Sequence, residues 1–130
     1  MINWVHQVFQ ETLQATWDSH RSTFLKHCKP SIEKWVDRED RREQRVLTRC
    51  RIGHTRLTKE HLYNRNVSKN CDTCQTELTV EHILINCIKY DNLRDELEIS
   101  SNIQVALGNN KSEETKVLKF LKKCNLYDKL

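Results

Sequence analysis

The sequence predicts an all-α protein, a small helical bundle with a zinc knuckle. Only two glycines and one proline occur in 130 residues, and 31% of the residues are charged, which is typical of helices joined by polar loops. Four metal-binding side chains, Cys71, Cys74, His82 and Cys87, follow the spacing C-x2-C-x7-H-x4-C. A core of this size is modest, and a bound metal ion would supplement it. We expect an N-terminal helical region over residues 1–65, the knuckle and its following helix over 66–98, and a helical tail over 99–130.

The first 65 residues are expected to hold two long helices and a short one. Apolar residues recur every four positions from Ile2 to Asp18, which predicts a helix whose apolar face lies in the core: Val5, Phe9, Leu13 and Trp17. The pattern breaks from Ser19 to Pro30. Pro30 and Ser31 then offer a start for a longer helix that Gly53 would end. A short helix after Thr58 would point Leu62 inward.

Within the knuckle, Thr79 is expected to cap a helix that carries His82 in its first turns and continues through Leu93 and Leu97. Cys87 lies five residues after His82, about 140° beyond one full helical turn. Both side chains can therefore reach one ion only if it sits over the helix start or the helix distorts near Cys87. In the tail, a short helix is expected between residues 100 and 108, and Ser112 is expected to cap the last helix.

The four ligands indicate a structural zinc site. Two thiolates two residues apart can hold one side of a Zn²⁺ ion, and His82 and Cys87 can complete a tetrahedron with no open position for catalysis. The alternatives are buried free cysteines with an incidental histidine, or disulfides. The first residues lack a basic region followed by an apolar run, so we expect no signal peptide and a reducing compartment. The remaining cysteines are interpreted as core or surface thiols: Cys28, Cys50 and Cys124. No segment is apolar enough to span a membrane.

Arginines are concentrated on either side of Glu43. Their three- and four-residue spacings predict one helix face that could bind nucleic-acid phosphates without reading base sequence. The candidate nucleic-acid-binding residues are Arg38, Arg41, Arg42, Arg45, Arg49, Arg51 and Arg56. The alternative is a solvated face on which Glu39 and Glu43 pair with some of the arginines. The candidates for stacking on unpaired bases are Trp35, Tyr63 and Tyr90.

Three runs of residues carry a resemblance to a known family. They are the run over residues 41–58, which ends in VLTRCRIGHTRLT, CDTC over 71–74 and LTVEHILINC over 78–87. Together they resemble the C-terminal tail that follows the ribonuclease H domain in the polyproteins of jockey-like non-LTR retrotransposons. The chain departs from that pattern at Cys50, where leucine is usual, and at Lys59, where histidine is usual.

The resemblance implies a tail that works beside polymerase, endonuclease and ribonuclease H domains during target-primed reverse transcription, in contact with RNA or DNA. It also implies an intracellular protein that is nuclear during integration. The ribonuclease H carboxylates of the family belong to an upstream domain, so we expect no enzymatic activity here. The acidic residues near the arginines are expected to form ion pairs and not a metal dyad: Asp37, Glu39, Asp40 and Glu43. His54 is expected to pack or hydrogen-bond. The alternative function is a zinc-stabilised helical module that docks onto those domains or onto a second copy.

Overall fold

The computed structural model describes residues 2–19, 23–32, 34–36 and 38–130. Over these residues the regular structure is helical, with one isolated antiparallel bridge between Asn70 and Glu77, so the predicted all-α class is confirmed. The longer helices are α1 (Ile2–Ser19), α3 (Arg41–Ile52), α5 (Asp91–Leu97) and α7 (Lys111–Lys123). The short ones are α2 (Phe24–Cys28), α4 (Arg56–Lys59), η1 (Glu60–Leu62), η2 (His82–Asn86), η3 (Ile88–Tyr90), α6 (Ile103–Ala106) and η4 (Tyr127–Lys129).

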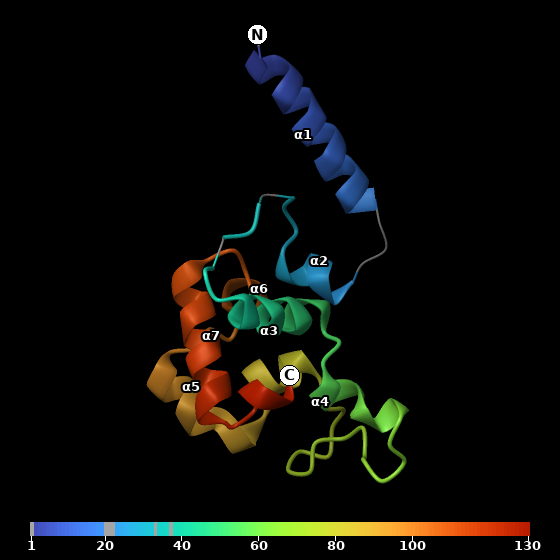
Figure 1. Cartoon of the computed structure of the whole chain (residues 1–130), viewed down its shortest axis with the longest axis vertical. Coiled ribbons are helices and arrows are strands. Elements are labelled where there is room, and N and C mark those ends of the chain that lie inside the picture. The colour runs from blue at the N-terminus through green and yellow to red at the C-terminus, as the bar shows by residue number, and fades with distance from the viewer. Residues whose placement is uncertain (1, 20–22, 33, 37) are drawn as a thin grey trace.

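Helix α1 has the predicted extent but not the predicted burial. It extends away from the rest of the molecule (Figure 1), and the Gln14 side chain near its C-terminal end donates to the Pro30 carbonyl and accepts from the Ile32 N–H. Val5 and Phe9 are 61% and 59% exposed, so the prediction that this face lies in the core is wrong. A four-residue period identifies an apolar face but not what covers it.

The second long helix starts later than predicted, at Arg41 and not at Pro30. Asp40 caps it, because its carboxylate accepts from the backbone N–H groups of Arg42 and Glu43. The Glu43 N–H contributes most to lowering the pKa of Asp40, so the cap is charged at neutral pH. Segment 23–28, inside the stretch predicted to lack a pattern, contains α2, capped by Thr23.

The chain before Asp40 is extended because its side chains pack elsewhere. The Trp35 ring lies between two cations, with Lys29 Nζ 4.2 Å and the Arg51 guanidinium carbon 3.9 Å from its centroid. Asn109 holds the same stretch by accepting from the Val36 N–H and donating to the Lys34 carbonyl. These contacts replace the helical hydrogen bonds that the apolar pattern predicted.

Gly53 ends α3 as predicted. It adopts the left-handed conformation (φ 78°), and its N–H bonds to the carbonyls of Arg49 and Cys50. The following helix, α4, begins before Thr58 because Thr55 caps it, with the two threonine side chains forming a capping box. Leu62 is 67% exposed, so the prediction that it points inward is wrong.

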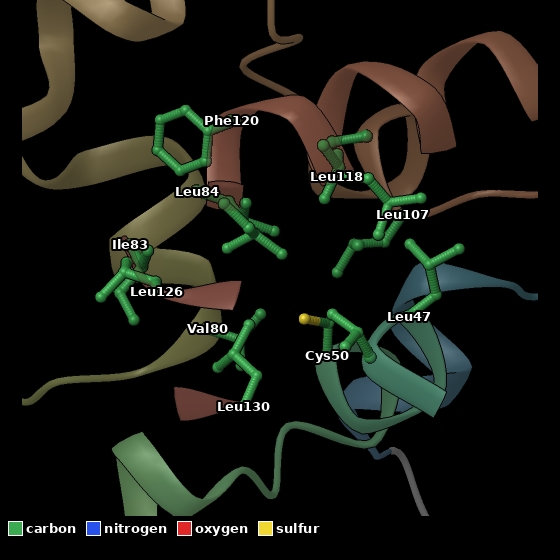
Figure 2. Close-up of a cluster of buried hydrophobic side chains, with 14 of the residues drawn as sticks. Leu47, Cys50, Val80, Ile83, Leu84, Leu107, Leu118, Phe120, Leu126 and Leu130 are labelled. Atoms are coloured by element: carbon green, nitrogen blue, oxygen red, sulfur yellow. The ribbon is translucent and has the colours of Figure 1, made fainter. Parts of the chain in front are cut away.

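The core joins residues that are distant in sequence. Figure 2 shows Leu47 and Cys50 from α3, Val80, Ile83 and Leu84 from the knuckle, and Leu118 and Phe120 from α7 around one buried cluster. Four elements pack on α7: α3, α5, α6 and η4. Burial raises the pKa of the Cys50 thiol to about 12, which keeps it protonated. Cys50 and Cys28 are therefore core thiols, as interpreted from the sequence.

A buried ion pair links α3 to α7. Glu114, 1% exposed, accepts from Arg51 Nη2 at 2.6 Å and from Arg38 Nη1 at 3.5 Å. Arg51 also donates to the carbonyls of Leu107 and Gly108. Glu114 is the only carboxylate that is buried with these two guanidiniums in the described part of the chain. It lies 63 residues after Arg51 in the sequence.

The cap of α7 offers a test of the structure. Asn110, and not Ser112 as predicted, caps the helix, because its side-chain oxygen accepts from the N–H groups of Ser112 and Glu113 at 2.9 and 3.2 Å. Asn110→Ala is expected to lower the free energy of unfolding by about 1 kcal/mol. Ser112→Ala is the matched control, with little expected change. Urea denaturation measures both, and a larger loss for Ser112→Ala would contradict the assigned cap.

Candidate metal centre

The four predicted ligands lie together. The ligand atoms of Cys71, Cys74, His82 and Cys87 are all within 4.8 Å of one another, and no disulfide joins them. Two segments supply them, a tight turn that carries the first two cysteines and the helical segment η2 that follows. The site can therefore hold a metal ion.

Backbone hydrogen bonds shape the turn. The Gln75 N–H bonds to the Cys71 carbonyl at 2.9 Å, and the Cys71 N–H bonds to the Thr76 carbonyl at 2.7 Å. Gln75 adopts a positive φ of 58°, which reverses the chain inside this turn. The Leu78 N–H closes the base of the turn on the Lys69 carbonyl at 2.8 Å. The two cysteines of the C-x2-C motif are thereby held beside each other.

A π-helix brings His82 and Cys87 into register. The Thr79 hydroxyl accepts from the His82 N–H at 3.1 Å, which confirms the predicted cap. The Cys87 N–H then bonds to the His82 carbonyl at 2.7 Å, an i→i+5 bond that places Cys87 over His82. This is the distortion that the five-residue spacing required. The backbone turns extended at Cys87 (ψ 119°), so the helix predicted to run on to Leu97 is interrupted, and α5 starts at Asp91.

The sulfur separations fit a tetrahedral metal ion. Cys87 Sγ lies 3.8 Å from Cys71 Sγ and 3.9 Å from Cys74 Sγ. A disulfide would need about 2.05 Å. Two thiolates at tetrahedral angles on an ion with bonds of about 2.3 Å are separated by about 3.8 Å. The spacing therefore fits ligands of one ion, and no disulfide joins these thiols.

His82 has the environment of a metal ligand. Its Nε2 is buried and has no hydrogen-bond partner in the described part of the chain, which is costly for a polar atom unless a ligand satisfies it. Its Nδ1 lies 3.5 Å from the Thr76 hydroxyl. A second partner of this kind orients a ligating imidazole. Thr76 is an addition to the site that the spacing alone did not indicate.

The two buried thiols differ in acidity. Burial raises the pKa of Cys71, but the backbone N–H groups of Cys74 and Thr73 and the His82 side chain together lower it to about 6. Burial raises the pKa of Cys87, and hydrogen bonds with the other two cysteines add to this effect. The cluster therefore favours a thiolate at Cys71. Further thiolates beside it would repel one another unless a cation neutralised their charge.

Arg94 supports the ligand segment from α5. Its guanidinium, in a side chain that is 9% exposed, donates to the Cys87 carbonyl and pairs with Asp91 three residues earlier. This contact fixes the backbone at the last ligand. The Asp91–Arg94 spacing is the only signal of it in the sequence, and ordinary surface helices show the same spacing.

The predicted arginine row is divided. Arg38 and Arg51 are withdrawn into the pair with Glu114, while five arginines are exposed: Arg41, Arg42, Arg45, Arg49 and Arg56. Arg42 pairs with Asp128 and lies 4.9 Å from the Tyr127 ring centroid. Arg49 donates to the Leu130 carbonyl at 2.8 Å. Glu43 pairs with Arg38 and Lys122, as expected for acidic residues among arginines, whereas Asp37 lies outside the described residues.

Three arginines line one open groove of about 570 Å³ along α3. Arg41, Arg45 and Arg49 follow one another at four-residue intervals, and Gln44 and Thr48 complete the lining. We call this surface the arginine groove. Arg41 and Arg45 have no ion pair with any described carboxylate, so their charges face solvent. The groove is the largest group of accessible cations on α3.

The other candidate residues are dispersed. His54 is not among the clustered ligands, and because it is exposed it does not pack in the core, one of its two expected roles. Tyr63 is 68% exposed, Trp35 is held between its two cations, and Tyr90 packs edge-on against Phe120 with centroids 5.8 Å apart. Tyr63 is thus the most accessible of the three aromatic candidates, and the half-buried Tyr90 lines a cavity beside the knuckle.

None of the helices in the described segments is both long and apolar enough to cross a membrane. No protein family, curated protein or solved structure matches the chain.

Proposed function

We propose that this chain is a zinc-stabilised, nucleic-acid-binding module, the non-catalytic tail of a non-LTR retrotransposon reverse-transcriptase and ribonuclease H polyprotein. The observation that carries the binding function is the arginine groove, with two cations that no carboxylate of the described chain neutralises. The attribution to a retroelement rests on the sequence runs over residues 41–58, 71–74 and 78–87.

Zinc is the metal that the ligand set favours. Three thiols and one imidazole match the soft and borderline donors that Zn²⁺ binds, and hard ions such as Mg²⁺ prefer oxygen. Four protein ligands leave no position for a reactive water, so the ion would stabilise the fold. Cys71, Cys74 and Cys87 would hold it as thiolates and His82 through its neutral ring.

The arginine groove suits a phosphate backbone. Guanidinium groups at four-residue intervals lie about 6 Å apart along a helix, and each can form a forked hydrogen bond with phosphate oxygens. Contacts of this kind release counterions and carry no sequence information. The module would thus bind RNA or DNA through the backbone, with an affinity that falls as salt rises.

A second candidate is protein docking, which the exposed apolar face of α1 favours. Trp4 and Phe9 are 69% and 59% exposed, an unusual amount for large apolar side chains on one helix. In this reading the zinc only stabilises the bundle, and the upstream domains or a second copy would cover α1. Binding to such a partner would depend little on salt.

A salt titration separates the two candidates. Fluorescence anisotropy with labelled oligonucleotides should show an affinity that falls steeply between low and physiological salt. Arg41→Glu/Arg45→Glu is expected to weaken binding and to reduce the slope of log affinity against log salt by about two. Lys111→Glu/Lys119→Glu, two exposed lysines outside the groove, gives the same charge change as a control. A folded protein with no binding at low salt would exclude the first candidate.

A further inference from the structure

A cavity of about 420 Å³ lies beside the metal centre, between the knuckle and the C-terminal end of the chain. We call it the knuckle cavity. Cys71 and Cys87 line one side, and the aliphatic part of the lining comes from five positions: Leu57, Val67, Leu78, Ile83 and Leu126. Its volume falls in the range of small-molecule sites, about 300–1,000 Å³. Two of the predicted metal ligands and several core residues therefore line the same cavity.

Two amide side chains project from the loop that borders the knuckle cavity. The backbone N–H groups of Asn66 and Asn70 are used locally, by the Asn64 and Ser68 side chains. Their own amide groups have no hydrogen-bond partner in the described part of the chain. An amide offers a donor and an acceptor side by side, the arrangement that pairs with the edge of a nucleobase.

An aromatic ring and charged groups complete the lining. Tyr90 is half-buried and fixed by its edge-on contact with Phe120. Lys89, whose Nζ lies 5.5 Å from the Tyr90 ring centroid, and Lys129 have no carboxylate partner among the described residues. Glu60 and Asp72 also line the cavity, and as carboxylates they can only accept hydrogen bonds, from N–H or O–H groups of a ligand. A bare phosphate would be repelled by these two carboxylates, whereas a base with amino groups would not.

We propose that the knuckle cavity holds one unpaired base of the bound nucleic acid. The apolar floor and Tyr90 accommodate the flat ring, the amides and carboxylates meet its edge, and Lys89 and Lys129 contact the neighbouring phosphates. A base inside a duplex is stacked on both faces and paired along its edge, so it would first have to be flipped out, which an unpaired base does not require. This inference rests on the proposed function, since it assigns the arginine groove to the backbone and the cavity to a single base.

The test uses a short duplex with one bulged nucleotide, and the same duplex with an abasic bulge that keeps every phosphate. The complete zinc-loaded chain should bind the bulged base roughly tenfold more tightly than the abasic bulge, the usual effect of one stacked base. Asn66→Leu/Asn70→Leu should bring this ratio close to one. Asn92→Leu/Gln104→Leu, at exposed positions outside the cavity, is the control and should leave the ratio unchanged.

The outcomes separate a failure of the cavity assignment from a failure of the proposed function. Equal affinity of the unaltered protein for both bulges would overturn the cavity assignment while the arginine groove stands. Absence of binding to any oligonucleotide at low salt would remove the proposed function and this inference with it. RNA and DNA versions identify the source of the base, and a tenfold ratio in either supports the proposal.

Discussion

Removal of the metal ion is expected to unfold the chain from Cys71 to Leu97 and to destabilise the rest. The turn that carries Cys71 and Cys74 is held by few backbone bonds, and three thiols packed within 4.8 Å repel one another as thiolates without a cation. Structural zinc contributes an apparent 10–16 kcal/mol in small domains, as much as a whole domain's usual stability of about 5–15 kcal/mol. Because Ile83 and Leu84 belong to the core, the loss should spread into α3 and α7.

The measurement is metal content by native mass spectrometry, paired with circular dichroism before and after addition of a chelator. We expect one Zn²⁺ per chain and a loss of helical signal on chelation. Cys74→Ser should lose the ion and the thermal transition. Cys124→Ser alters a half-buried thiol outside the cluster and should retain both. A Cys74→Ser protein with unchanged metal content and thermal stability would refute the ligand assignment.

Glu114→Gln is expected to be the most damaging single substitution away from the metal. It keeps the shape of the side chain but removes the negative charge that Arg51 and Arg38 share. A buried charge left without its partner typically costs about 3–5 kcal/mol. Arg51 cannot turn to solvent easily, because it also lies on Trp35 and donates to two carbonyls. The loss should therefore reach the upper part of that range.

Equilibrium denaturation in urea measures this loss. Glu96→Gln is the matched control, since its carboxylate pairs with Lys123 at the surface and such pairs contribute about 0–1 kcal/mol. A difference between the two variants of less than about 1 kcal/mol would show that the buried pair is not important for stability.

The sequence was a good guide where the signal is local. Gly53 and Thr79 end and begin helices as expected, because a left-handed stop and a hydroxyl cap each depend on a few neighbouring residues. The four ligands were found for the same reason, since the last lies only sixteen positions after the first. A distorted helix near Cys87 was one of the two arrangements that the spacing allowed, and its π-helical form did not follow from the spacing.

Features that depend on distant residues could not be predicted. Nothing in the sequence near Arg51 indicates that it forms a buried ion pair with Glu114. Periodicity alone therefore places Arg51 in the arginine row. Pro30 has the features of a helix start. The sequence does not show that Trp35 packs against Lys29 and Arg51, the contacts that keep the chain after Pro30 out of a helix. The apolar period of α1 predicts a face that packs against something. Periodicity gives no information about which surface covers that face, and in this structure it is exposed.

The shared core also limits how this chain can change during evolution. Val46 and Leu47 precede the metal ligands, Val117 and Phe120 follow them, and all four pack with Val80, Ile83 and Leu84 of the ligand segment. Recombination at any point between these groups would join halves whose buried surfaces had not been selected together. We therefore expect the bundle and its metal-binding segment to be inherited as one block, with exchange tolerated only outside it, for instance in α1.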